Sequence, residues 1–261
     1  KKTMPLSPQN LQNIRIGFIF EVCIIIVWLG LLFLMFRHYQ EKKTKINRLV
    51  LIAFSLLWLS IVSSAIAKLI FLITEKELAD FESTQIYWIV SRITQYRIAF
   101  SMIIAAIYFL YLFKEEIYQE KQNQFKNRIY LTIGTYFIAF CLLMQFNQEN
   151  ILLDLICFCL TAIYSMLVLI PFIVQSFQLY RRIDNSERIF KKGILSLMFM
   201  SGFLLLILIF MVLDRLLILI NPESSGFSIF YYLGWTSAIL SLISAYFGYI
   251  RPAIEQKRIR S

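Results

Sequence analysis

Seven ionisable residues lie within stretches that are otherwise apolar, and they are the residues of this chain best placed to do chemistry: Glu21, Lys68, Arg92, Arg97, Asp154, Asp214 and Arg215. We call these seven residues the charged layer. Ionisable groups are costly inside a membrane, so they usually face the interior of a helix bundle or a water-filled cavity. We expect Lys68 to pair with Glu21 and Arg215 with Asp154. Because four members are basic and three acidic, one positive charge remains.

The predicted chemistry is the binding of a small anionic or zwitterionic ligand. A guanidinium group binds a carboxylate or a phosphate through two parallel hydrogen bonds. We therefore expect Arg92 or Arg97 to meet the ligand, with Gln95 and Tyr96 beside them and the rest of the charged layer around it. The alternative interpretation is that all seven charges form interhelical ion pairs that only hold the bundle together.

Seven apolar stretches can position the charged layer. Hydrophobic residues make up 59% of the 261 residues and charged residues only 16%, which excludes an ordinary soluble domain. A helix of about 20 mostly apolar residues crosses the hydrocarbon core of a membrane. The predicted fold is an all-α integral membrane protein, a single domain over 1–261, with spans at 16–36, 49–74, 87–113, 129–146, 151–177, 194–220 and 228–250. The apolar runs are continuous rather than alternating, which excludes a membrane β-barrel.

The basic residues predict the orientation of the spans. Most of the 26 Lys and Arg residues lie in alternate connections and the final tail, and such residues mark the cytoplasmic side. The sequence therefore predicts a multi-pass protein of the cell membrane with the N-terminus outside and the C-terminus in the cytoplasm. Attraction to anionic lipids of the inner leaflet explains the basic connections, and nucleic acid is not expected as a partner.

The charged layer is expected at a common depth. Glu21, Lys68, Arg92 and Asp214 each lie five or six residues from the predicted outer end of a span, which is roughly 8–9 Å below it. Arg97 is expected deeper, at roughly 15 Å. The inner halves of the predicted spans carry no charge. We therefore expect a cavity that opens outward and is closed below.

Catalytic and metal-binding constellations are not visible in the sequence. The single histidine, His38, has no Cys or carboxylate cluster beside it, and no Gly-rich phosphate loop occurs. The four cysteines lie inside predicted spans, where we expect small buried side chains. We expect no enzyme activity, no cofactor and no metal.

The predicted layout resembles known families of seven-helix proteins. Seven spans with the N-terminus outside are similar to microbial rhodopsins, G-protein-coupled receptors and the seven-helix sensor modules of prokaryotes. The span 228–250 contains no Lys to bind retinal, and the third span ends in YLFKEE rather than in an acidic-Arg-aromatic triplet. The resemblance to prokaryotic sensor modules extends over the whole chain as topology, with a local match at YFGYIRP (246–252). It implies a receptor or sensor.

The predicted function is a seven-helix receptor or sensor that relays ligand binding to its cytoplasmic loops or to a cytoplasmic partner protein. The alternatives are a transporter or channel for small solutes and a structural subunit of a larger membrane assembly. A stripe of small residues on the last span predicts either close packing within the chain or a homodimer contact: Gly234, Ala238, Ser241, Ala245 and Gly248. Position 1 is Lys, which is consistent with a cropped or processed chain.

Overall fold

The structure is a computed structural model that describes residues 8–74, 90, 92–93, 96–118, 124–143, 151–184, 187–220 and 228–250. Its helices are α1 (Pro8–Glu41), α2 (Lys45–Thr74), α4 (Arg97–Ile117), α5 (Gln124–Leu143), α6 (Ile151–Arg182), α7 (Arg188–Ile220) and α8 (Ile229–Ala245). A π-helical turn, η3 (Tyr246–Ile250), extends α8. Within the described ranges there is no strand.

Six of these helices are long and apolar enough to cross a membrane: α1, α2, α4, α6, α7 and α8. In lipid, backbone groups find no water, and a helix satisfies them within its own segment. The buried hydroxyls follow the same rule, because Ser165, Ser176 and Ser201 each donate to the carbonyl four residues earlier. The fold therefore fits a multi-pass, all-α membrane protein.

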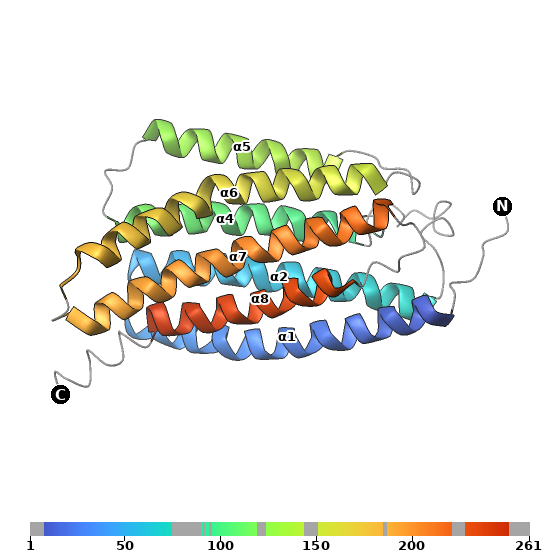
Figure 1. The fold of residues 1–261 in the computed structure, drawn as a ribbon, viewed down its shortest axis with the longest axis horizontal. Helices are drawn as coiled ribbons and strands as arrows, with labels where there is room; N and C mark the ends of the chain where they lie inside the picture. Colours follow the sequence, from blue (N-terminus) through green and yellow to red (C-terminus); the bar gives the residue numbers. More distant parts are fainter. Residues whose placement is uncertain are drawn as a thin grey trace.

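The six apolar helices form a closed ring. Neighbours in the ring are α1 and α2, α2 and α4, α4 and α6, α6 and α7, α7 and α8, and finally α8 and α1. Helix α5 lies outside this ring against α4 and α6, and it forms one edge of the bundle in Figure 1. On α5 only Gly134 and Cys141 are buried, so most of this helix faces away from the protein.

The helices run along a common axis (Figure 1). We call the end where α1 begins and α2 ends the predicted outer end, and the opposite one the predicted inner end. The described connections 42–44 and 183–184 lie at the predicted inner end, beside the beginning of α5 and α7. At this end Thr44 caps α2, because its Oγ1 accepts a hydrogen bond from the Asn47 backbone N–H at 3.2 Å.

The predicted third span differs from the structure at both ends. The helix α4 begins at Arg97, after Tyr96 in a left-handed conformation with φ 58°, so the span 87–113 is not one continuous helix. Residues 75–89, 91, 94 and 95 lie outside the described residues. At its other end α4 continues to Ile117, which places Lys114 and Glu115 in the helix and not in the connection.

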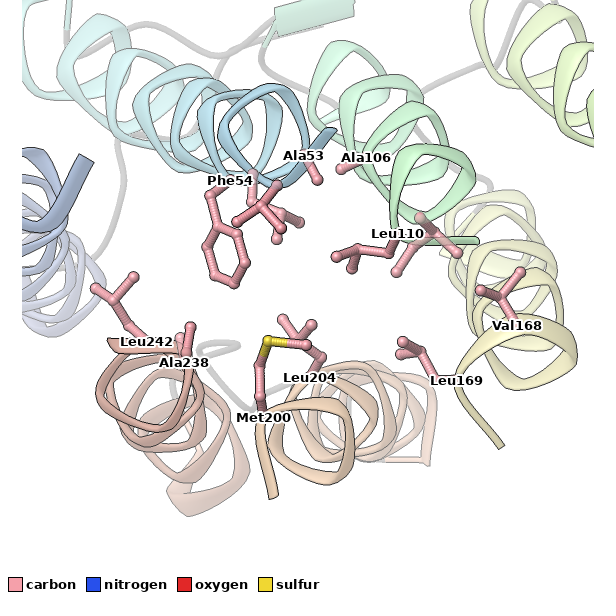
Figure 2. Packing of buried hydrophobic residues seen from close by; sticks show 14 of the residues in the cluster. Ala53, Phe54, Ala106, Leu110, Val168, Leu169, Met200, Leu204, Ala238 and Leu242 are labelled. Atoms are coloured by element: carbon pink, nitrogen blue, oxygen red, sulfur yellow. The ribbon is translucent and has the colours of Figure 1, made fainter. Parts of the chain in front are cut away.

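A packed apolar core fills the ring toward the predicted inner end. Figure 2 shows side chains of α2, α4, α6, α7 and α8 pointing toward a common centre. Every labelled side chain is buried: Ala53, Phe54, Ala106, Leu110, Val168, Leu169, Met200, Leu204, Ala238 and Leu242. Among the described residues, these buried apolar side chains form a packed floor in this half of the bundle.

The stripe of small residues on α8 and η3 packs within the chain. A Cβ atom added to Gly248 would lie 3.1 Å from the Gly193 carbonyl oxygen and 3.1 Å from the Leu197 nitrogen, both on α7. A Cβ atom on Gly234 of α8 would lie 3.1 Å from the side chain of Met211, which is also on α7. Small residues let helices approach closely in lipid. The stripe is thus used between α8 and α7, as the first of the two interpretations predicted.

Candidate functional site

A cavity of about 300 Å³ lies inside the ring, above the apolar core. All six ring helices line it, as does Tyr96 in front of α4. Its polar lining residues are Glu21, Ser60, Ser64, Lys68, Tyr96, Arg215 and Tyr231, together with the indole rings of Trp28 and Trp235. Volumes of 300–1,000 Å³, mostly apolar with a few polar groups, are typical of small-molecule sites.

A buried ion pair forms one wall of the cavity. Lys68 Nζ lies 2.7 Å from Glu21 Oε1, and both side chains are almost fully buried. The same oxygen accepts hydrogen bonds from Ser64 Oγ at 2.8 Å and from Tyr231 Oη at 3.1 Å. Helices α1, α2 and α8 therefore meet at one carboxylate. The predicted pairing of Lys68 with Glu21 is confirmed.

Glu21 and Trp28 each leave one polar atom available to a ligand. Among the described residues, Glu21 Oε2 and Trp28 Nε1 have no hydrogen-bond partner, although both atoms are buried. A buried carboxylate oxygen or indole N–H without a partner costs about 1–3 kcal/mol or more. Both residues line the cavity, on the same face of α1 and two turns apart.

Arg215 provides the cavity's second positive charge. Its guanidinium carbon lies 5.6 Å from the centre of the Tyr96 ring and 5.5 Å from that of Phe158. Within the described ranges Arg215 makes no ion pair. Its predicted partner is Asp154, whose side chain lies outside the part of the chain that the structure describes. Aromatic rings hold a cation without neutralising it, so no group among the described residues offsets the charge of Arg215.

Tyr96 lies between the positive charges of Lys68 and Arg215 and directly precedes α4. Its ring centre lies 5.4 Å from Lys68 Nζ and 5.6 Å from the Arg215 guanidinium. The left-handed backbone of Tyr96 costs roughly 1–3 kcal/mol, and such strain gathers at functional sites. Tyr96 was a predicted site residue, and it lines the cavity. Gln95, predicted beside it, lies outside the described residues.

Arg92 and Arg97 are buried but do not line the cavity. Arg92 Nε donates to the Leu142 carbonyl of α5 at 3.3 Å. Arg97 follows Tyr96, whose ring touches Lys68 and Arg215, so Arg97 begins α4 near the level of Lys68 and not about one turn deeper. The depth prediction was wrong because it assumed a continuous helix across the break. Of the three arginines of the charged layer, Arg215 is the one that lines the cavity.

Asp214 holds the beginning of α8. Its Oδ1 accepts hydrogen bonds from Ser228 Oγ at 2.6 Å and from the Ser228 backbone N–H at 3.1 Å. Ser228 Oγ in turn accepts from the Phe230 backbone N–H at 3.2 Å and caps the helix. Asp214 is buried but is not a lining residue of the cavity. Its role in the structure is to position α8, which carries Tyr231 to Glu21.

A second group of charges lies at the predicted inner end. Glu115 Oε1 lies 3.0 Å from Lys114 Nζ and 3.5 Å from Lys126 Nζ of α5, and Lys114 and Glu115 are buried. Glu116 pairs with Lys45 of α2 at 2.7 Å. These charges lie outside the predicted span 87–113, but α4 continues to Ile117 and brings Lys114, Glu115 and Glu116 into the inner end of the helix. The KEE triplet was visible in the sequence, but the predicted span ended one residue before it.

Tyr118 ties the inner end of α4 to α6. Its hydroxyl and Ser176 Oγ are 2.6 Å apart. Burial raises the pKa of Tyr118 to about 12, and the hydrogen bond to Ser176 opposes part of that rise. The phenol therefore remains protonated at neutral pH, and the link between the two helices is present there.

The cavity combines a few charged groups with a larger apolar surface. The described residues contain no group of three His, Cys, Asp or Glu side chains that could hold a metal ion. Within the part of the chain that the structure describes, the cavity offers a guanidinium without an ion pair, a carboxylate oxygen without a hydrogen-bond partner and a deep apolar part. Comparison of the chain with protein-family models, with curated proteins and with solved structures finds no match.

Proposed function

We propose that this chain is a seven-helix membrane receptor or sensor. It binds a small anionic or zwitterionic molecule in the cavity and relays the event to its cytoplasmic loops or to a partner protein. The observation that carries the proposal is a cavity of about 300 Å³ with Arg215 in its wall and a packed apolar core beneath it. A closed floor suits signalling better than passage of the ligand.

The topology supports seven crossings. If the six ring helices cross the membrane, α4 ends on the inner side and α6 begins on the outer side. The chain between them must then cross as well, and α5 is the helix available. Its 20 residues span about 30 Å, the thickness of the hydrocarbon core. The basic residues beside the connections 42–44 and 183–184 support an N-terminus outside and a C-terminus inside.

A path for the relay runs along α4. This helix lines the cavity through Ala99, Phe100, Ile103 and Ile107, and its other end carries Glu115 and Glu116. Those two carboxylates pair with Lys126 of α5 and Lys45 of α2. Movement of α4 on ligand binding would therefore change ion pairs at the predicted inner surface, where a partner protein or anionic lipid lies.

Hydrogen–deuterium exchange in lipid nanodiscs tests the proposal. A panel of carboxylates, phosphate monoesters and amino acids is added, and exchange is followed at residues 42–44 and 183–187. We expect at least one compound to change exchange in the wild type and not in Arg215→Gln. The matched control is Arg181→Gln, an exposed arginine at the inner end of α6, which should respond like the wild type.

Two results would replace this function by another. Arg215-dependent uptake of a compound into proteoliposomes would establish a transporter and overturn the receptor. A complete lack of response to the panel, together with an obligatory companion protein on purification from the native membrane, would favour a structural subunit.

A further inference from the structure

The cavity is elongated along the axis of the bundle. Its lining extends on α4 from the preceding Tyr96 to Ile107 and on α7 from Arg215 to Leu204. Each interval is eleven residues, or about 16 Å of helix. A round cavity of about 300 Å³ would be much shorter than this. The volume is therefore spread along a narrow, deep space rather than gathered around the charges.

The charged groups of this space are confined to one end, and below them the indole N–H groups of Trp28 and Trp235 are the polar atoms that have no hydrogen-bond partner among the described residues. The charged side chains of Glu21, Lys68 and Arg215 lie at its predicted outer end. The deep part is lined mainly by Trp28, Leu57, Ile61, Ile103, Ile107, Leu204 and Leu208. The one hydroxyl on α2 at this depth, Ser60 Oγ, donates to the Leu57 carbonyl at 2.7 Å and is satisfied within its own helix. The space thus matches a molecule with a polar head and an apolar chain.

Two atoms define the chemistry of the head. Arg215 favours an anionic ligand, because its guanidinium contacts the rings of Tyr96 and Phe158 and makes no ion pair within the described ranges. Glu21 Oε2 calls for a hydrogen-bond donor. Lys68 Nζ already lies 2.7 Å from the other oxygen of that carboxylate. A neutral donor such as a hydroxyl or an amide N–H therefore fits better than a second ammonium, which Lys68 would repel.

We propose that the ligand is a single-chain anionic amphiphile with a neutral hydrogen-bond donor next to its anionic group. The head lies between Arg215 and Glu21, and the apolar chain runs down the cavity to Trp28. This inference rests on the proposed function, since it names the ligand class of the same cavity. A membrane lipid with one chain and a water-borne amphiphile share this chemistry.

Calorimetric titration of the full chain in nanodiscs tests the ligand class with four acids. We expect 3-hydroxydecanoate to bind. Decanoate lacks the hydroxyl and should bind roughly tenfold more weakly, because it cannot donate the hydrogen bond to the charged oxygen of Glu21. The chainless 3-hydroxybutyrate should bind at least roughly 100-fold more weakly, because six buried methylenes are missing. The shorter 3-hydroxyhexanoate should be intermediate.

Two variants separate binding in the cavity from partition into lipid. Arg215→Gln should abolish the saturable heat of all four acids and leave their partition unchanged. Ser60→Leu adds bulk to the middle of the cavity and should weaken 3-hydroxydecanoate roughly tenfold while sparing 3-hydroxyhexanoate. Thr236→Leu makes the same change on the exposed face of α8 and should bind like the wild type. If Ser60→Leu fails to fold, the chain-length series in the wild type decides alone.

Mass spectrometry distinguishes the two sources. Enrichment of a single-chain anionic lipid in extracts of the wild type over Arg215→Gln identifies a membrane lipid. If the extracts of the two proteins contain equal amounts of such a lipid, and added 3-hydroxydecanoate binds to the wild type, the ligand is a water-borne amphiphile. Arg215-dependent binding of a chainless amino acid or phosphate ester, without preference for a chain, would overturn the amphiphile and leave the receptor standing. No Arg215-dependent binding of any compound would overturn both.

Discussion

Replacing Lys68 by Met should destabilise the protein strongly, and the loss should vanish when Glu21 is neutralised too. Lys68→Met removes the ammonium that lies 2.7 Å from Glu21 Oε1 and leaves a carboxylate that is fully buried. Removing one partner of a buried ion pair costs about 3–5 kcal/mol. The hydrogen bonds from Ser64 and Tyr231 still hold the carboxylate, so we expect about 3 kcal/mol, the lower end of that range.

The double variant, Glu21→Gln with Lys68→Met, places a neutral amide and an apolar chain of similar volume at the same positions. Such replacements of a buried pair are often neutral. We expect its free energy of unfolding to lie within about 1 kcal/mol of the wild type, which gives a coupling energy of about 2 kcal/mol or more. The assay is a titration with dodecyl sulfate in mixed micelles, followed by circular dichroism.

The matched control is the pair of Lys45 and Glu116, which has the same separation of 2.7 Å but is much more exposed, at 48% and 30% of the side-chain surface. Lys45→Met should cost no more than about 1 kcal/mol. Equal losses in Lys45→Met and Lys68→Met, or additive losses in the double variant, would refute the reasoning. Burial of the Glu21–Lys68 pair would then not be the cause of its effect on the free energy of unfolding.

Four further predictions concern single positions. Tyr96→Gly should cost about 1 kcal/mol less than Tyr96→Ala, since only glycine adopts φ 58° without strain; thermal unfolding in detergent measures both. Gly248→Ala should lower the free energy of unfolding by about 1–3 kcal/mol, because the new Cβ meets backbone of α7, whereas Gly202→Ala, with open space around it, should be neutral or slightly stabilising in the same titration. Glu115→Gln removes the carboxylate that lies 3.0 Å from the buried Lys114 ammonium and should cost about 1.5–3 kcal/mol in that assay, the range of a hydrogen bond between charged groups. The pKa of Tyr118 rises from 10 in the unfolded chain to about 12 in the fold. The stabilisation that protonated Tyr118 gives the folded state is therefore complete below pH 10 and is lost as the pH rises through 12. Between these pH values the free energy of unfolding of Tyr118→Phe should fall less than that of the wild type.

Hydropathy and the pattern of charge were sufficient to predict the elements that hold the site. The apolar runs correspond to the six ring helices and α5, because hydrogen bonding in lipid allows little else. The pairing of Lys68 with Glu21 was predictable as well. The two residues lie at matching depths on consecutive helices, and a charge at that depth needs a partner.

The structure differs from the sequence-based prediction where one backbone angle changes the register. A single left-handed residue, Tyr96, has no signature in hydropathy, yet it resets the depth of Arg97. Rotation about the helix axis was equally hidden: Asp214 and Arg215 are neighbours, but Asp214 accepts hydrogen bonds from Ser228, the N-cap of α8, and Arg215 lines the cavity. The position of α5 outside the ring depends on which of its faces packs against α4 and α6, and hydropathy does not distinguish one face of this helix from another.

The contact between α1 and α8 also has a consequence for biosynthesis. Tyr231 donates to Glu21, 210 positions earlier in the chain, so the ring closes only after α8 has entered the membrane. Until then the bundle is open beside α1, and among the described residues the carboxylate of Glu21 has only Lys68 and Ser64 of α2 as partners. We therefore expect that a chain truncated before α8 would lack both the closed ring and the hydrogen bond from Tyr231 to Glu21.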